Sequence, residues 1–215
     1  MGVTVSIDQV AGLAPNMRSP YRAAFERGQA VLDRYGISAT PLRVVHFVAQ
    51  TLHETGAYML LAENLDYSAA RLVAVWPARF RPKGALDPAQ YAHRPELLAD
   101  AVYGGRMGNT DPGDGYAYRG RGMLQLTGRA NYAEATRQLR QGRADSPDFV
   151  LAPDAVADAE WCLAVAAAAW AAKGCNALAD QDDVRALTRR INSGDTGLAE
   201  RIEWTRRARL VWRQA

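Results

Sequence analysis

Two glutamates and a short polar segment are the residues of this chain whose types and spacing fit catalysis. Glu54 follows a helix-like pattern, and Glu63 comes nine residues later. Further along, Gln125 and Thr127 lie in a glycine-rich segment. Cleavage of a glycosidic bond uses one carboxyl group as an acid and a second as a base, with polar side chains that hold sugar and water. The residue types present match that chemistry.

Glu54 is expected in the last turn of a helix that ends near Gly56. The C-terminal end of a helix carries partial negative charge. Apolar neighbours would add desolvation, and the candidates are Leu52, Tyr58 and Leu60. Both effects disfavour an ionised carboxylate, so the position predicts a protonated Glu54 that serves as a general acid. The alternative is an ordinary surface glutamate at a helix end.

Glu63 can face Glu54 only if the helix breaks between them. Nine residues of continuous helix correspond to about 900°, which places the two side chains on opposite faces. A break at Gly56 and a short return segment over 57–61 would bring them together across a groove. Asp66 is the competing candidate for the base, and an ion pair with an arginine is the competing interpretation of Glu63.

The segment that contains Gln125 and Thr127 has a pattern suited to a ligand. Its glycines allow close approach of the backbone, and Leu124 and Leu126 alternate with the two polar residues. A glutamine amide can donate to and accept from a sugar, and a threonine hydroxyl can orient a water. The alternative is a short buried strand with two exposed polar residues.

Helix start and stop signals predict a mostly helical single domain over residues 1–215, without a separate wall-binding module. The signals are capping residues or prolines at the start, apolar stripes within, and glycines at the end. The predicted helices cover 19–36, 40–56, 68–76, 95–103, 129–141, 154–173, 182–191 and 198–212. Residues 104–122 contain seven glycines and predict a long loop, with room for a short hairpin.

Taken together, these motifs resemble glycoside hydrolase family 19, in the short form found in phage endolysins and related bacterial chitinase-like enzymes. The resemblance spans about residues 40–205 and rests on His53-Glu54-Thr55, Glu63-Asn64-Leu65-Asp66-Tyr67-Ser68, the block from Gly120 to Tyr132, and Arg190-Ile191-Asn192-Ser193-Gly194. It implies a mainly α, lysozyme-like (α+β) fold with two lobes and a substrate groove. It also implies inverting hydrolysis of β-1,4 bonds next to N-acetylhexosamines.

The resemblance implies a role for each matching residue. Glu54 matches the general acid, Glu63 the base, and Thr127 the residue that steadies the attacking water. The substrate-binding positions that it implies are His53, Gln125, Asn131, Tyr132 and Asn192, of which His53 and Tyr132 line the groove.

Two positions depart from the family pattern. Asp66 stands where the family usually has an asparagine, which leaves the choice of base between Glu63 and Asp66 open. Ser193 stands where the family has a glycine, which is a mild change.

Metal and disulfide chemistry are not expected. A zinc protease motif would need a second histidine at position 57, which is Ala57, and a calcium loop would need a glutamate that is not at the required spacing. We therefore expect no metal and no cofactor. Cys162 and Cys175 are expected to be free thiols, which fits synthesis in a reducing compartment.

The charge balance suggests acidic partners. The formal net charge is +3, and 24 of the 26 basic residues are arginines. Such an excess favours a bacterial wall, a lipid surface or nucleic acid, and of these the wall fits the catalytic motifs whereas nucleic acid is not expected. The C-terminal helix could touch an outer membrane, or its arginines could simply be solvated. The arginines concerned are Arg201, Arg206, Arg207, Arg209 and Arg213.

The sequence therefore predicts a monomeric, peptidoglycan-degrading glycosidase of the endolysin type. The N-terminus has no secretory signal pattern, so we expect synthesis in the cytoplasm and action at the cell wall after release. A chitinase that acts on chitin oligomers is the first alternative. An inactive saccharide-binding protein is the second.

Overall fold

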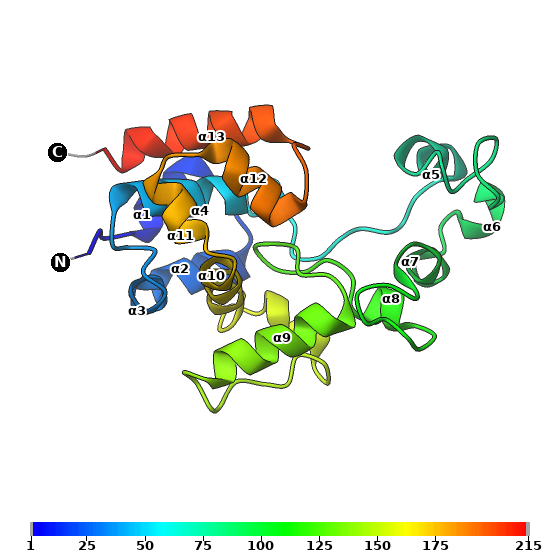
Figure 1. Cartoon of the computed structure of the whole chain (residues 1–215), viewed down its shortest axis with the longest axis horizontal. Coiled ribbons are helices and arrows are strands. Elements are labelled where there is room, and N and C mark those ends of the chain that lie inside the picture. The colour runs from blue at the N-terminus through cyan, green and yellow to red at the C-terminus, as the bar shows by residue number, and fades with distance from the viewer. Residues whose placement is uncertain (1, 214–215) are drawn as a thin grey trace.

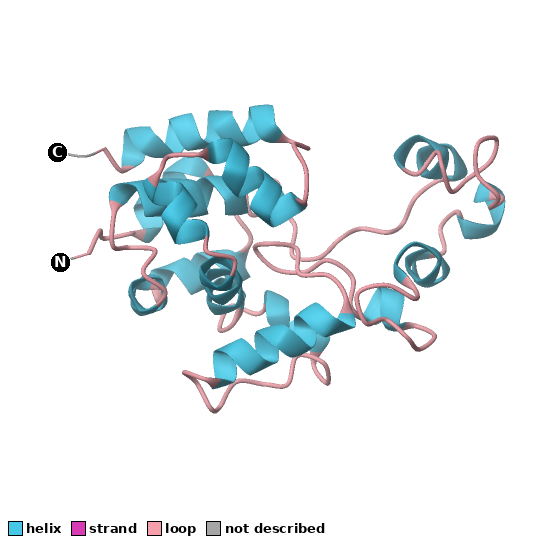
Figure 2. Cartoon of the chain, in the orientation of Figure 1, coloured by secondary structure: helices cyan, strands magenta, loops and turns pink. Residues whose placement is uncertain are grey.

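The computed structural model describes residues 2–213, which form two helical lobes (Figure 1). The larger lobe contains α1 (Ile7–Leu13), α2 (Ser19–Glu26), α3 (Gln29–Arg34), α4 (Pro41–Glu54), α9 (Arg129–Arg140), the 3-10 helix η1 (Pro153–Ala157), α10 (Cys162–Ala172), α11 (Cys175–Asp180), α12 (Val184–Asn192) and α13 (Leu198–Val211). The smaller lobe contains α5 (Ala69–Val75), α6 (Pro88–Tyr91), α7 (Pro95–Tyr103) and α8 (Asp114–Ala117). Within the described residues the β-structure is limited to isolated bridges (Figure 2). The predicted mainly α, two-lobed fold is confirmed.

The central helix of the larger lobe is α4, which carries Glu54 at its end. Thr40 caps α4 by accepting a hydrogen bond from the Arg43 amide at 3.3 Å, and Pro41 occupies its first turn. Every residue from Val44 to Leu52 is buried. A helix that is buried on all sides belongs to the core, and α13 packs along it. Glu54 is therefore held at the end of a rigid element.

The smaller lobe has an apolar core of its own, built around Leu65, Leu72, Phe80 and Leu98. Two connections join it to the larger lobe, and they run antiparallel at the junction. The Glu63 amide donates to the Gly120 carbonyl at 2.8 Å, and the Gly122 amide donates to the Leu61 carbonyl at 2.9 Å. These backbone bonds fix the relative position of segments that are far apart in the sequence.

One predicted helix is two helices in the structure. The helix expected over 19–36 breaks at Gly28, which separates α2 from α3. A Cβ on Gly28 would lie 2.3 Å from Cδ2 of Leu163, so a glycine is needed where α10 approaches this break. The sequence pattern alone does not contain this contact.

Other differences are smaller. The segment predicted as a helix over 154–173 begins as η1, and α10 starts only at Cys162. The glycine-rich stretch over 104–122 contains the short helix α8, and α1, α6 and α11 were not predicted. Cys162 and Cys175 are both free and buried, as expected. Among residues 2–213, no helix combines the length and apolar character that a bilayer crossing requires.

The C-terminal helix α13 differs from the predicted basic, solvent-facing helix at one position. The side chain of Arg201 is buried and points into the protein, where it pairs with Glu54. On the outer side, Arg206 pairs with Glu203 at 2.8 Å, and Arg209 pairs with Asp182. The assignment of Arg201 to an exposed basic face is therefore wrong, because its side chain is buried and forms an ion pair with Glu54.

Candidate active site

Glu54 ends α4 with its side chain only 15% exposed. Its carboxylate accepts a hydrogen bond from the Arg201 guanidinium, which also donates to Gln50. The apolar surroundings expected for this carboxyl group are not what the structure shows. Leu52 and Tyr58 point into the core and Leu60 is exposed, so an arginine on α13 is the main partner of Glu54 instead.

The chain reverses direction directly after Glu54, as the glycine at position 56 predicted. Gly56, Ala57 and Tyr58 have φ values of 56°, 60° and 62°. Such a run is unfavourable for the two residues with side chains. Buried bonds hold it, because the Tyr58 amide donates to Oγ1 of Thr55 at 2.8 Å and the Tyr58 hydroxyl bonds the Thr51 hydroxyl at 2.7 Å. The reversal brings the following segment back past the end of α4.

Glu63 lies on that returning segment, at the junction of the lobes. The Tyr103 hydroxyl, at the end of α7, donates to both carboxylate oxygens of Glu63 at 2.7 and 2.8 Å. Burial raises the pKa of Glu63 above its ordinary value, and the hydrogen bond from Tyr103 opposes this shift. Glu63 is thus a largely buried carboxyl group held by the smaller lobe.

Gly120 is the point around which the predicted polar residues gather. A Cβ at this position would lie 3.0 Å from Oε1 of Gln125, 3.3 Å from Oγ1 of Thr127 and 3.5 Å from Cβ of Glu63. A Cβ at 120 would therefore crowd Gln125 and Thr127 and would touch Glu63. The absence of one leaves room for them beside the same backbone atom.

Gln125 and Thr127 are held by bonds to nearby carbonyls. The Gln125 amide nitrogen donates to the Gly122 carbonyl at 3.0 Å, so its Oε1 remains available to a ligand. The Thr127 hydroxyl donates to the Gln125 carbonyl at 2.9 Å. Because its hydrogen is used in this way, the hydroxyl oxygen can accept a hydrogen bond from a water or a sugar. Residues 122–125 form a turn rather than a strand, with a φ of 47° at Gln125.

These residues line one cleft of about 310 Å³ that is open to solvent. Its walls include Glu54, Glu63, Tyr103, Gly120, Gln125, Thr127 and Asn192. A groove of about 620 Å³ continues from it along α9, and Gln125, Thr127 and Asn192 line both. Asn131 lies in this groove, where its amide donates to the Thr127 carbonyl at 2.7 Å. The structure therefore brings six predicted site residues together.

Two predicted groove residues lie elsewhere. Tyr132 has no exposed surface, and its hydroxyl donates to the Arg119 carbonyl at 2.7 Å. The prediction that Tyr132 lines the groove is wrong, because its ring packs in the core between α9 and α10. His53 packs against Gly197 at the start of α13, and burial lowers its pKa. It is not among the side chains that line the cleft, and its contact with a sugar stays a prediction.

Asp66, the competing base, is not among the residues that line the cleft. Its carboxylate bonds Nδ1 of His93 at 2.7 Å, and both side chains are exposed. A water between a sugar and Asp66 would lie outside the cleft that contains Glu54. The geometry thus favours Glu63.

Arg201 and Tyr103 are two site residues that the sequence reasoning missed. Arg201 lies 147 positions from Glu54, and Tyr103 lies 40 positions from Glu63. Neither occurs in a motif that indicated catalysis, and only the folded chain brings them together. The resulting site has two carboxyl groups with different partners, one donor to each, and polar side chains beside them. Such an arrangement can protonate a leaving oxygen and activate a water.

Comparison with known proteins adds to this geometry. No protein-family model matches the chain. The chain is 38% identical over 159 residues to a glycosyl hydrolase family 19 domain-containing protein of Haemophilus influenzae, covering 73% of this chain and 74% of that protein.

Solved structures share the fold. A bacterial family 19 chitinase superposes with a TM-score of 0.63 at 22% identity, over 98% of this chain and 96% of that one. Chitinase C of Streptomyces griseus superposes with a TM-score of 0.62 at 18% identity, over 98% and 93%. A class IV chitinase of Zea mays gives a TM-score of 0.56 at 17% identity, over 97% and 91%. The identity to the Haemophilus protein is high enough to assign the family as well as the fold. We conclude that this chain is a glycosidase that belongs to glycosyl hydrolase family 19.

Proposed function

We propose that this glycosidase cleaves the glycan strands of peptidoglycan at a β-1,4 bond next to an N-acetylhexosamine, with inversion at the anomeric carbon. The observation that carries the proposal is the shared cleft, because Glu54 and Glu63 both line it. Glycoside hydrolysis by a carboxyl pair needs both groups beside one linkage.

In the proposed reaction Glu54 is the acid and Glu63 is the base. Glu54 gives its proton to the glycosidic oxygen as that bond breaks. Glu63 removes a proton from a water that attacks the anomeric carbon from the opposite face. Thr127 accepts a hydrogen bond from the same water. Its hydroxyl hydrogen is already used in the bond to the Gln125 carbonyl, so its oxygen is oriented to accept.

The surroundings of Glu63 support its role as base. A general base becomes stronger as its pKa rises toward the working pH, and burial raises the pKa of Glu63. Glu54 has a different requirement, because an acid must carry a proton before it can donate one. The Arg201 guanidinium bonds Oε1 of Glu54, which leaves Oε2 for the proton that the proposed reaction transfers.

An inverting enzyme also needs space for the water between the two carboxyl groups. That space corresponds to roughly 6.5–9.5 Å between them. We predict a separation in or above this range for the unliganded protein.

The groove along α9 supports a polymeric substrate. Its polar wall includes Thr127, Asn131 and Gln138. Asn131 and Gln138 are seven residues apart on α9, which corresponds to about 10 Å of helical rise and is longer than one sugar ring needs. Amide side chains along this length can bond the hydroxyl and acetamido groups of successive sugars.

Peptidoglycan is favoured over chitin by charge. The chain has a formal net charge of +3. Peptidoglycan carries carboxylates, whereas chitin is neutral, so the wall polymer gains more from a basic protein. Chitin oligomers remain the second candidate substrate, because the solved structures with this fold are described as chitinases. We place the action of the enzyme at the bacterial wall, as a monomer without a cofactor and without nucleic acid as a partner.

The test compares two substrates. Turbidity of outer-membrane-permeabilised Gram-negative cells should fall on addition of the protein, and chitin oligomers should be cleaved more slowly. Mass spectrometry of the products identifies the reducing end and hence the bond that is cut. Faster cleavage of chitin oligomers would make the protein a chitinase. If neither the cells nor the chitin oligomers are degraded, the protein is a saccharide binder.

The proposal includes a weak contact of α13 with an outer membrane. Ile202 and Leu210 are exposed on this helix, 51% and 53% respectively, and Arg207 stacks on Trp204 at 4.3 Å. Arg206 and Arg209 already form ion pairs with acidic residues of the protein. Vesicle binding by α13 should accordingly be weak and sensitive to salt.

A further inference from the structure

Arg121 is a buried cation in one of the two connections between the lobes, and the reaction described above gives it no part. Its side chain is only 3% exposed, and it is not among the residues that line the cleft or the groove. A charge in such a place needs partners that compensate for its lost hydration. The partners of Arg121 therefore indicate what it does.

The backbone of Arg121 pairs with both segments that carry the proposed catalytic side chains. On one side it forms an antiparallel bridge with Ala62, directly before Glu63, and the flanking hydrogen bonds are those that join the lobes. On the other side it forms a bridge with Leu126, directly before Thr127. The Arg121 amide donates to the Leu126 carbonyl at 3.1 Å, and the Leu126 amide donates back at 2.8 Å. One residue is thus paired with the neighbours of both Glu63 and Thr127.

The side chain of Arg121 connects this junction to three other elements. Nη1 donates to the Ala117 carbonyl at the end of α8 at 2.6 Å and to the Tyr132 hydroxyl of α9 at 3.0 Å. Nη2 pairs with Asp154 of η1 at 2.7 Å. A guanidinium presents its donors in a rigid planar fork, so these bonds fix its direction as well as its position. Because α8 belongs to the smaller lobe and α9 and η1 belong to the larger one, the fork is bonded to both lobes.

Tyr132 adds a second connection at the same place. Its hydroxyl accepts the bond from Arg121 and donates to the Arg119 carbonyl at 2.7 Å. Arg119 and Arg121 are the two residues that flank Gly120. The buried hydroxyl of Tyr132, which was expected in the groove, therefore holds the chain on both sides of Gly120.

We propose that Arg121 is a positioning residue for hydrolysis, which fixes the segment that carries Glu63 and the segment that carries Thr127 in a single arrangement. The inference rests on the roles proposed above for these two residues. Gly120, directly before Arg121, lies against both, since a Cβ on it would be 3.3 Å from Oγ1 of Thr127 and 3.5 Å from Cβ of Glu63. A displacement of about 1 Å between reacting groups is enough to slow a reaction about 100-fold. Loss of the bonds that Arg121 makes would allow such a displacement.

Hydrogen exchange of the free, ¹⁵N-labelled protein, followed by NMR, tests the positioning without a substrate. The amides that form the bonds beside Arg121 are those of Glu63, Gly122 and Leu126. Arg121→Lys keeps the positive charge but lacks the fork. In this variant the three amides should exchange about tenfold faster or more than in the wild type. Wild-type exchange in the buried helix α4 shows that the variant folds, and wild-type exchange at the three amides would overturn the proposal.

Steady-state kinetics separate positioning from binding. Arg121→Lys should lower kcat on a soluble glycan fragment by about 10- to 100-fold. KM should change by less than about twofold, because a group that only positions the reacting atoms does not hold the saccharide. Much of the groove wall comes instead from α9 and α12, through Asn131, Gln138 and Asn192. A loss that appears in KM alone, or an unchanged kcat, would contradict the role of Arg121.

A milder variant keeps the test decisive if Arg121→Lys does not fold. Asp154 is 86% exposed, so Asp154→Asn removes only the outer partner of Arg121 and leaves its buried bonds in place. This variant should accelerate exchange at the same three amides and lower kcat by about two- to fivefold. If it changes neither quantity, the proposal fails.

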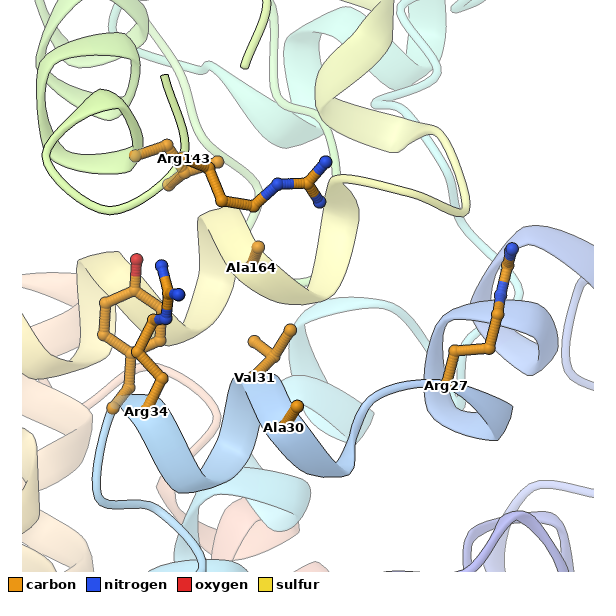
Figure 3. Close-up of a pocket in the computed structure, with 8 residues that line it drawn as sticks. Arg27, Ala30, Val31, Arg34, Arg143 and Ala164 are labelled. Atoms are coloured by element: carbon orange, nitrogen blue, oxygen red, sulfur yellow. The ribbon is translucent and has the colours of Figure 1, made fainter. Parts of the chain in front are cut away.

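The matched control is Asp145→Asn. Asp145 is also exposed, and it pairs with Arg143 at 2.7 Å. Arg143 lines a cavity of about 270 Å³ on the larger lobe (Figure 3), and among residues 2–213 none lines both this cavity and the cleft. The control should therefore leave both exchange at the junction and kcat at their wild-type values. Equal effects of Asp154→Asn and Asp145→Asn would mean that loss of surface charge is responsible, and would count against the proposal.

The two readouts also separate this inference from the proposed function. Full activity of Glu63→Gln would refute the proposed chemistry, and the exchange of the free protein would still decide whether Arg121 fixes the junction. A large loss of activity in Glu63→Gln together with unchanged exchange in Arg121→Lys would keep the proposed chemistry and refute the role of Arg121.

Discussion

At the scale of single residues, Glu54 and Glu63 differ in what holds their carboxyl groups. Arg201, a cation, holds Glu54 from α13, whereas Tyr103, a neutral donor, holds Glu63 from α7. Two carboxyl groups can take different roles in one reaction when their surroundings differ. The following three predictions test those roles.

Glu54→Gln should lower turnover of peptidoglycan by about 100- to 10,000-fold, since the amide cannot donate the proton that a general acid supplies. The amide has nearly the same shape, so the variant should fold. Initial rates of lysis measure the effect, and thermal unfolding provides the control. Lysis at the wild-type rate would exclude Glu54 as the acid.

Tyr103→Phe should move the acidic limb of the pH–rate profile to higher pH. The Tyr103 hydroxyl stabilises the carboxylate form of Glu63 and lowers its pKa against the effect of burial. Its removal lets that pKa rise, so the base loses its charge at a higher pH as the solution is acidified. The measurement is kcat/KM against pH on a soluble glycan fragment. If the rate falls at every pH but the acidic limb keeps its position, Tyr103 positions Glu63 without changing its pKa.

Glu63→Gln should reduce turnover far more than Asp66→Asn, by about 100-fold or more for loss of a general base. Glu63 lines the cleft, whereas Asp66 pairs with His93 outside its lining. The two variants are compared in the same lysis assay, with circular dichroism as the control for folding. A larger effect from Asp66→Asn would reverse our assignment of the base.

The sequence was sufficient for the residues that belong to local motifs. Glu54, Glu63, Gln125 and Thr127 meet as predicted, because a tight reversal and a glycine-rich turn bring them together. Residues that act across the fold were not found in this way. A sequence motif also cannot show which side of a helix faces the core, and for that reason Tyr132 was misplaced.

At the scale of elements, local signals located helices well where capping decided their limits. Thr40 and Ser68 begin α4 and α5 by bonding the amides of Arg43 and Arg71 at 3.3 Å. The break at Gly28 is different, because the sequence predicted one helix there and the structure has two. A Cβ at Gly28 would clash with Leu163 of α10, and this contact between distant segments is not visible in the sequence pattern.

Gly28→Ala tests that contact. The added Cβ would lie 2.3 Å from Cδ2 of Leu163 and 2.7 Å from the Ala24 carbonyl oxygen. We expect a loss of about 1–3 kcal/mol in the free energy of unfolding, as is typical when a packed core is overfilled. Chemical denaturation measures the loss, and Gly12→Ala is the control because a Cβ there meets nothing within 4 Å. Equal stability of the two variants would show that α3 shifts to make room.

At the scale of the whole molecule, each lobe has its own core, and a few backbone bonds join them at the junction. A glycan in the cleft contacts both lobes, since Tyr103 comes from one side and Asn192 from the other. Amides near Glu63 and Gly122 should therefore exchange hydrogen more slowly when the Glu54→Gln variant is saturated with saccharide. Mass spectrometry of exchanged peptides measures this, and protection limited to α9 and α12 would mean that the smaller lobe does not share in binding.

The attachment of Tyr103 to Glu63 has a mechanical consequence. Tyr103 of the smaller lobe holds Glu63, whereas Glu54 ends a helix of the larger lobe, so the distance between the two carboxyl groups depends on how the lobes are set relative to each other. On the proposed wall substrate we expect slower hydrolysis where cross-links keep a glycan strand from reaching both carboxyl groups.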